Sequence, residues 1–287
     1  MGNEHNETDR LLQIRWVSDT SKPAPVLAEN AAEAVALLDA GSQAFSRLGD
    51  GEGPYEIVVD PEAFGVVHES DDDGILNQEP FAAVLSCSDA RVPIELTLGR
   101  AGNDLFVVRV AGNVPGAECI GSLHYASDHL PTIRVFAIVG HSNCGAVTAA
   151  VDSLLTPREY LPIARLAPLR GIVDSLFGGI RMAVVALERA TGHDPMRTPV
   201  MREALIAVSA LANTALTASV VSRELGRDTV FGVYDLEQRA VGAWGAGGWA
   251  PGFVAAPQTD QELADLIAGA ATLFAQQLAL TPTGTPS

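Results

Sequence analysis

The chain has 287 residues, of which 47% are hydrophobic, and its 18 basic residues are outnumbered by 35 acidic ones, for a formal net charge of −17. So acidic a chain has no general attraction to phosphate backbones or anionic lipid, and we expect no nucleic-acid partner and no membrane partner. The excess lies at the ends, because residues 1–80 hold 17 acids and 4 bases while residues 81–253 hold 15 and 14.

The cysteine content indicates a reducing compartment. Cys87, Cys119 and Cys144 are too few and too scattered for a disulfide framework, and their odd number favours reduced thiols or metal ligands. The first residues have neither the basic region nor the apolar region of a secretory signal, so we expect a cytoplasmic protein.

The N-terminal third is predicted to hold one helix. Helix formers with a helical spacing of apolar residues run from about Leu27 to Leu48. Residues 1–25 are polar, and residues 49–79 are rich in Gly, Asp and Glu and include Asp71-Asp72-Asp73. We therefore expect the chain to be frayed at its start and to form an acidic, largely irregular connection after the helix.

The sequence pattern changes at Pro80. After this residue, apolar runs of strand length alternate with segments that have a helical spacing of apolar residues. The predicted strands are residues 81–86, 105–110, 135–139 and 229–234. The predicted helices are residues 119–130, 145–155, 172–190, 199–225 and 259–278, the last with Thr259 and Glu262 spaced as a capping box. Strands that are apolar on both faces and alternate with helices predict an α/β fold with a mainly parallel central sheet flanked by helices.

One apolar stretch is long enough to be considered as a membrane span. Residues 204–222 carry no charge over 19 residues, about the length of a membrane span. The stretch also contains six Ser, Thr or Asn residues, which dilute its hydropathy. We therefore predict a helix buried between subunits and no membrane span.

The residues after two strands form a candidate metal site. Functional groups in such sheets collect at the carboxyl ends of strands. The first strand ends in Cys87, with Asp89 and Arg91 just beyond, and the third ends in His141 with Cys144 three residues on. Two thiolates and one imidazole suit zinc, and Asp89 offers a harder fourth ligand.

Three firm ligands with a replaceable fourth position are typical of a catalytic zinc site. A water bound there would have a pKa of about 7 and serve as a hydroxide nucleophile. Arg91 is placed to hold the Asp89 carboxylate in a bidentate pair, which would let Asp89 orient that hydroxide. If the ion pair between Arg91 and Asp89 breaks, Asp89 can bind the zinc and close the site.

The motifs around these residues resemble the β-class carbonic anhydrases. They are Cys87-Ser-Asp-Ala-Arg91-Val, Asp104-Leu-Phe-Val-Val-Arg109, Ala111-Gly-Asn113, Gly121-Ser-Leu-His-Tyr125-Ala and Gly140-His-Ser-Asn-Cys144-Gly145. The resemblance runs from about Gln78 to Val151 and resumes weakly at residues 230–235 and Val241. The chain departs from the family at Ala90, Val110 and His124, and residues 152–228 match it poorly.

The resemblance implies reversible hydration of carbon dioxide to bicarbonate and a proton by zinc-bound hydroxide. It implies one zinc ion per subunit at Cys87, His141 and Cys144, with Asp89 and Arg91 as the catalytic dyad. It also implies a homodimer, or a higher even oligomer, with the pocket formed across a subunit interface. Gln78 would reach into the partner's pocket to bind substrate, and the residues lining that pocket would be Phe106, Ala111, Tyr125 and Gly145.

These expectations divide the chain into three parts. Residues 1–80 form an acidic N-terminal extension with a helical arm, residues 81–253 the zinc-binding α/β catalytic domain, and residues 254–287 a C-terminal helix and tail. Cys119 lies away from the candidate metal ligands in the predicted fold, so we expect it in the core. His124 and His129 could shuttle protons, although helix histidines are more often surface or satisfied residues.

Two alternative functions stay open. The same site could hydrolyse carbonyl sulfide or carbon disulfide, as relatives of the family do, and pocket shape would distinguish the substrates. The chain could instead be a non-catalytic zinc-binding or bicarbonate-binding protein. The intact Asp89 and Arg91 argue against that second reading, because a structural site needs no dyad to orient a hydroxide.

Overall fold

The structure is a computed structural model that describes residues 14–18, 28–48, 55–59, 77–245 and 247–280. The predicted helix start at Leu27 and the Asp71–Asp73 run lie outside these residues. A two-stranded parallel ladder joins β1 (Ile14–Ser18) to β2 (Tyr55–Val59). Neither strand was predicted from the sequence, because these short runs with β-branched residues stand inside polar and acidic surroundings.

A seven-stranded sheet forms the centre of the described chain, in the order β4-β3-β5-β6-β7-β8, with β9 paired to β6. The strands β3 (Ala82–Ser86), β4 (Leu105–Arg109), β5 (Val135–His141) and β6 (Thr229–Asp235) run parallel, which confirms the four predicted strands. Every residue of β3 and β5 is buried. This is expected of parallel strands that are covered on both faces.

The far end of the sheet is antiparallel. It is built from β7 (Ala240–Gly245), β8 (Gly248–Pro251) and β9 (Val254–Ala255). These strands are short and rich in Gly and Ala, so they lack the apolar runs that identified the others. Only Val241, matched to the last strands of the family, pointed to this part of the sheet.

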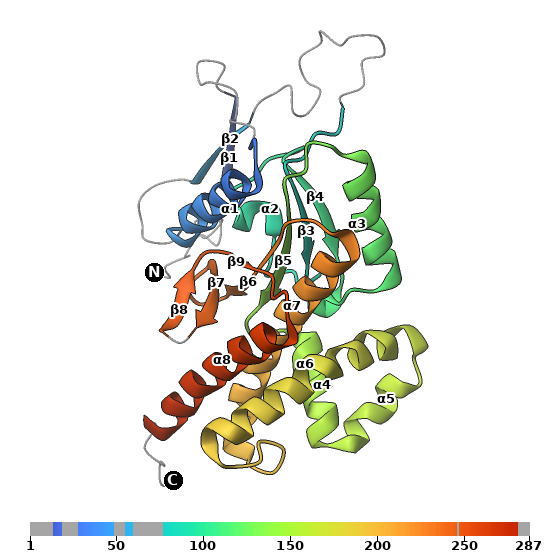
Figure 1. The fold of residues 1–287 in the computed structure, drawn as a ribbon, viewed down its shortest axis with the longest axis vertical. Coiled ribbons are helices and arrows are strands. Elements are labelled where there is room, and N and C mark those ends of the chain that lie inside the picture. The colour runs from blue at the N-terminus through green and yellow to red at the C-terminus, as the bar shows by residue number, and fades with distance from the viewer. Residues whose placement is uncertain (1–13, 19–27, 49–54, 60–76, 246, 281–287) are drawn as a thin grey trace, which may run out of the picture.

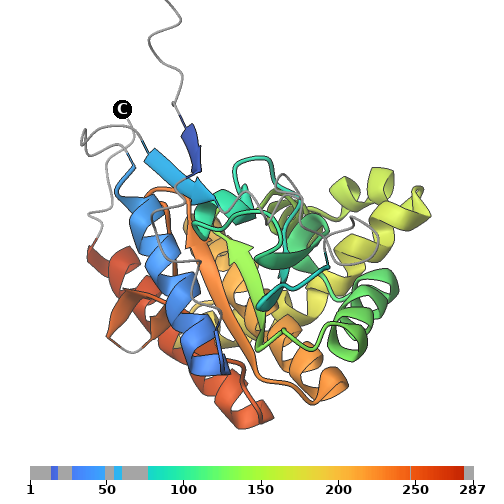
Figure 2. The ribbon, with the colours of Figure 1, turned by 90° about the horizontal axis from the view of Figure 1, so that it is seen from above.

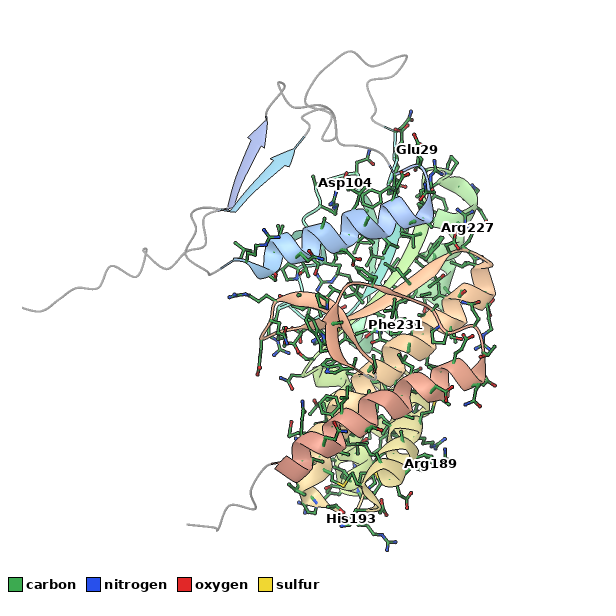
Figure 3. All side chains as sticks on the ribbon, turned by 60° about the vertical axis from the view of Figure 1, so that its left-hand side comes forward. Glu29, Asp104, Arg189, His193, Arg227 and Phe231 are labelled. Carbon is green, nitrogen blue, oxygen red and sulfur yellow. The ribbon has the colours of Figure 1, made fainter. Side chains whose placement is uncertain are left out.

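Helices cover both faces of the sheet (Figure 1). On one face lie α1 (Ala31–Ser46) and α2 (Ile94–Thr97). The other face carries α3 (Ala117–His129), α4 (Gly145–Leu155), α6 (Ala167–Thr191), α7 (Arg202–Leu225) and α8 (Asp260–Leu280), and the short α5 (Tyr160–Ala164) packs on α6. Figure 3 shows Phe231 at the centre of the molecule, between the sheet and these helices.

The predicted helices are confirmed with small changes at their ends. The capping box at α8 is confirmed in part, because the Thr259 hydroxyl accepts the N–H of Glu262 at 3.1 Å. The Glu262 carboxylate, however, accepts the N–H of Gln258 rather than that of Thr259.

The helix α1 lies on the sheet of its own subunit (Figure 2). The hydroxyl of Ser42 accepts the N–H of Val241 at 2.8 Å, and the Asp39 carboxylate accepts the N–H of Phe253 at the same distance. At Gly41 the helix packs directly against the backbone of Leu98. The N-terminal arm expected from the sequence is therefore, in its helical part, a layer of the α/β domain.

The helix α7 is the central helix of this subunit, which corrects the prediction that it is buried between subunits. The segment Pro199–Leu225 is long and apolar enough to cross a membrane, but 83% of its most apolar stretch is buried inside the structure. It packs on α6, α8, β5 and β6. The sequence gives the apolarity of this helix but not the neighbours that cover it.

Replacing Gly41 by alanine should loosen the packing of α1. The new methyl group would overlap the carbonyl oxygen of Leu98, so we expect a loss of about 1–3 kcal/mol in the free energy of unfolding. The control is Gly171→Ala in α6, where a methyl group meets no atom within 4 Å. This substitution should raise the free energy of unfolding by about 0.5–1 kcal/mol, because alanine favours the helix over glycine. Urea unfolding measures both, and equal effects would contradict the tight packing at Gly41.

The substitution Asp39→Asn tests the burial of α1 through pH. Burial raises the pKa of Asp39 above its ordinary value of 3.8, although the Phe253 N–H opposes this shift. Between pH 3.8 and the higher pKa of the folded state, the folded protein keeps a proton that the unfolded protein has lost. The free energy of unfolding therefore falls as the pH rises through this range. We expect Asp39→Asn to have a higher Tm than the wild type at pH 7 and the same Tm at about pH 3. A pH-independent difference would contradict this explanation.

Candidate metal centre

Two neighbouring strands and one helix bring three metal-binding side chains together. Cys87 directly follows β3, His141 ends β5, and Cys144 immediately precedes α4. Each offers one ligand atom, and these atoms lie within 4.8 Å of one another. All three residues are buried. The structure thus confirms that the predicted ligands converge at one edge of the sheet.

The imidazole of His141 is oriented for coordination. Its Nδ1 lies 3.0 Å from the carbonyl oxygen of Ser142, and because that oxygen can only accept, Nδ1 carries the proton. The lone pair is then on Nε2, which is buried and has no hydrogen-bond partner among the described residues. A buried acceptor without a partner, facing two thiols, fits a metal ion.

The two thiols lie close enough to share a hydrogen bond. Their Sγ atoms lie 4.0 Å apart, and the backbone N–H of Gly112 donates to Cys87 Sγ at 3.3 Å. Hydrogen bonding from Cys144 lowers the pKa of Cys87 against the opposing effect of burial, and the Gly112 N–H lowers it further. The same contact and burial raise the pKa of Cys144. The Gly112 N–H therefore favours the thiolate form of Cys87, which is the form in which a cysteine binds a metal ion.

Asp89 lies beside the three ligands, held by Arg91. The Arg91 Nε donates to Asp89 Oδ1 at 2.9 Å and the Arg91 Nη2 to Oδ2 at 2.7 Å, which is the predicted bidentate pair. These hydrogen bonds are the main reason that the pKa of Asp89 lies well below its usual range. Asp89 Oδ2 is 3.8 Å from His141 Nε2. The structure thus shows the arrangement in which Asp89 is paired with Arg91.

A second arginine, Arg109, fixes the loop that carries Asp89. Its Nε donates to the carbonyl oxygen of Cys87 at 3.0 Å, and its Nη2 donates to that of Asp89 at 2.8 Å. Arg91 adds a bond to the carbonyl oxygen of Asn143, in the loop before Cys144. Arg109 belongs to one of the motifs that carry the family resemblance, but its role does not follow from the sequence. A charged residue at the end of an apolar strand was the available signal.

The predicted substrate residues are not all near the ligands in this subunit. Ala111 opens the turn that contains Gly112, and Gly145 follows Cys144, where an added methyl group would meet nothing within 4 Å. Gln78 is exposed and precedes β3, at the strand end opposite Cys87. Its role across a subunit interface stays a prediction.

Two aromatic residues predicted to line the pocket form a separate pair. The rings of Phe106 and Tyr125 have centroids 6.4 Å apart, and Tyr125 is 52% exposed. The Tyr125 ring also packs against the His129 ring, with the two centroids 4.8 Å apart. The register places Phe106 opposite Ala83, well before the carboxyl end of β3. Their pocket role therefore also stays a prediction. Cys119 is buried in the core, as expected.

The comparisons agree with the motifs. A family model described as carbonic anhydrase matches residues 82–237. Carbonic anhydrase 2 of Mycobacterium tuberculosis is 38% identical over 96 residues, 32% of this chain and 46% of the relative. A carbonic anhydrase of Pseudomonas aeruginosa is 32% identical over 177 residues, covering 58% of this chain and 74% of the relative.

The match to the mycobacterial relative spans under half of that protein's length. Among solved structures, the chain is similar to the β-carbonic anhydrase CafA of the fungal pathogen Aspergillus fumigatus, with 20% identity and a TM-score of 0.46. That match covers 65% of this chain and 80% of the fungal protein.

Metal analysis of the purified chain tests the ligand set. We expect about one transition-metal ion per chain and a large loss of metal in Cys87→Ser, because a hydroxyl is a much poorer ligand for a soft cation than a thiolate. Cys119→Ala is the matched control, since Cys119 is buried but outside the cluster, and it should keep the metal. Full metal content in Cys87→Ser would contradict this site.

Proposed function

The chain belongs to the β-class carbonic anhydrase family, and from this premise we propose that it is a zinc enzyme that catalyses the reversible hydration of carbon dioxide to bicarbonate and a proton. The observation that carries this proposal is the Asp89–Arg91 pair. A purely structural metal site needs four ligands and no carboxylate held beside them. Here the carboxylate lies next to the ligands without joining them.

The residues present fit zinc. The donors are two thiols and an imidazole nitrogen whose other ring nitrogen donates to a carbonyl oxygen, which is the usual outer-sphere arrangement for a zinc-bound histidine. Cys87, His141 and Cys144 would hold the ion, one per subunit. When bound, zinc supplies the positive charge that makes a water molecule acidic near neutral pH.

The chain's own residues then perform three tasks. Asp89 is ionised and directs Oδ2 toward the cluster, so it can accept a hydrogen bond and orient the group that donates it. Arg91 keeps this carboxylate in place, and Arg109 fixes the backbone that carries it. The Arg91 side chain is 54% exposed, against 16% for Asp89, so the dyad connects the buried ligands to solvent.

We propose a homodimer or a higher even oligomer in which Gln78 and the Phe106–Tyr125 pair complete the partner's pocket. The half-exposed Tyr125 and the position of β4 at one edge of the described sheet support this arrangement. A cytoplasmic location is proposed from the three free cysteines.

Stopped-flow hydration of carbon dioxide tests the role of Asp89. With zinc loaded, Asp89→Asn should keep its metal but lose about 10²–10⁴-fold in kcat/KM, because the amide carries no negative charge and its Nδ2 cannot accept a hydrogen bond. The control Asp265→Asn changes an exposed carboxylate on α8 and should leave the rate unchanged. Zinc-loaded wild type with no activity between about pH 7 and 9, where the water should ionise, would contradict the proposed function.

The substitution Arg91→Lys separates charge from geometry. Lysine keeps the positive charge but cannot donate from two fixed nitrogens to one carboxylate, so Asp89 should be less well held. We expect an intermediate kcat/KM, below the wild type and above Asp89→Asn, in the same assay. A wild-type rate would show that the bidentate geometry is unimportant.

A further inference from the structure

A buried asparagine on α7 contacts the backbone beside the metal centre. Asn213 is 3% exposed, and its Nδ2 donates to the carbonyl oxygen of Gly112 at 2.8 Å. The N–H of the same glycine donates to Cys87 Sγ at 3.3 Å. Two hydrogen bonds through one residue therefore connect the central helix to a metal ligand. Asn213 lies in the region 152–228, whose role the sequence left open.

The backbone between these bonds has a conformation that its surroundings must maintain. Gly112 has φ +70° and Asn113 has φ 43°, both in the left-handed region. A methyl group added at Gly112 would lie 3.3 Å from Ala146 and from Leu176, so the turn is closely packed. Such conformations persist where neighbouring contacts fix them. The Asn213 amide provides one of these contacts, through the carbonyl oxygen of Gly112.

The position of Asn213 is itself tightly fixed. At Gly179, α6 crosses α7 so closely that an added methyl group would lie 2.9 Å from the backbone nitrogen of Asn213 and 3.0 Å from its Cα. This crossing leaves the Asn213 backbone little room to shift. The amide can therefore transmit the rigidity of the packed helices to the turn.

We propose that Asn213 is a positioning residue for the metal centre, which aims the Gly112 N–H at Cys87 Sγ and so sets the donor strength of that thiolate. The inference rests on the metal site of the proposed function but not on its substrate. A hydrogen bond to a thiolate lowers the energy of the sulfur lone pairs and fixes the direction of the ligand. Outer-sphere contacts of this kind change metal affinity by about 10- to 100-fold.

Cobalt(II) is the probe, because its absorption reports on the coordinated sulfurs. The variant is Asn213→Leu, which has the shape of asparagine without the donor and suits the apolar core around α7. We expect the sulfur-to-cobalt charge-transfer band to move to longer wavelength and the affinity, measured by chelator competition, to fall about 10- to 100-fold. Asn213→Ala should show the same changes and serves if the leucine variant does not fold.

The matched control is Thr217→Val, one turn along α7. The Thr217 hydroxyl is buried and has no hydrogen-bond partner in the described part of the chain, so its loss should leave the band and the affinity unchanged. A wild-type band and affinity in the folded Asn213 variants would overturn the inference, as would equal changes in Thr217→Val. Failure of the wild type to bind cobalt would contradict the metal site itself and, with it, the proposed function.

Discussion

The parallel pairing of β3 with β5 is the constraint on which the site depends. Its register sets Ser86 opposite Val139, so Cys87 and His141 leave the sheet at the same edge on neighbouring strands. The turn after His141 then returns Cys144 to the same place, with its Sγ 4.0 Å from that of Cys87. A change of register would separate the ligands, and no helix packing could restore them.

The layers around the sheet keep this register. Both faces of β3 and β5 are covered, by α1 and α2 on one side and by α3 and α7 with their neighbours on the other, so the strands cannot slip without exposing apolar surface. Polar contacts at the strand ends add direction to this packing. Arg109 fixes the backbone of Cys87 and Asp89, while Asn213 fixes Gly112.

Most of the site could be predicted from the sequence because its signals are local. Cys87, Asp89, Arg91, His141 and Cys144 each lie within a few residues of an apolar strand end, and the parallel sheet makes such ends adjacent. The rest depends on contacts between distant segments. The sequence does not show that α7 is covered by its own subunit, nor that Asn213 reaches Gly112, 101 residues away.

X-ray absorption at the zinc edge of the zinc-loaded protein tests the central claim most directly. The claim is that Cys87, His141 and Cys144 bind the ion while Arg91 holds Asp89 aside. It predicts two sulfur atoms at about 2.3 Å together with imidazole nitrogen at about 2.0–2.1 Å, and one further light atom that survives in Asp89→Asn. A shell of nitrogen and oxygen alone, or one with a single sulfur, would contradict it.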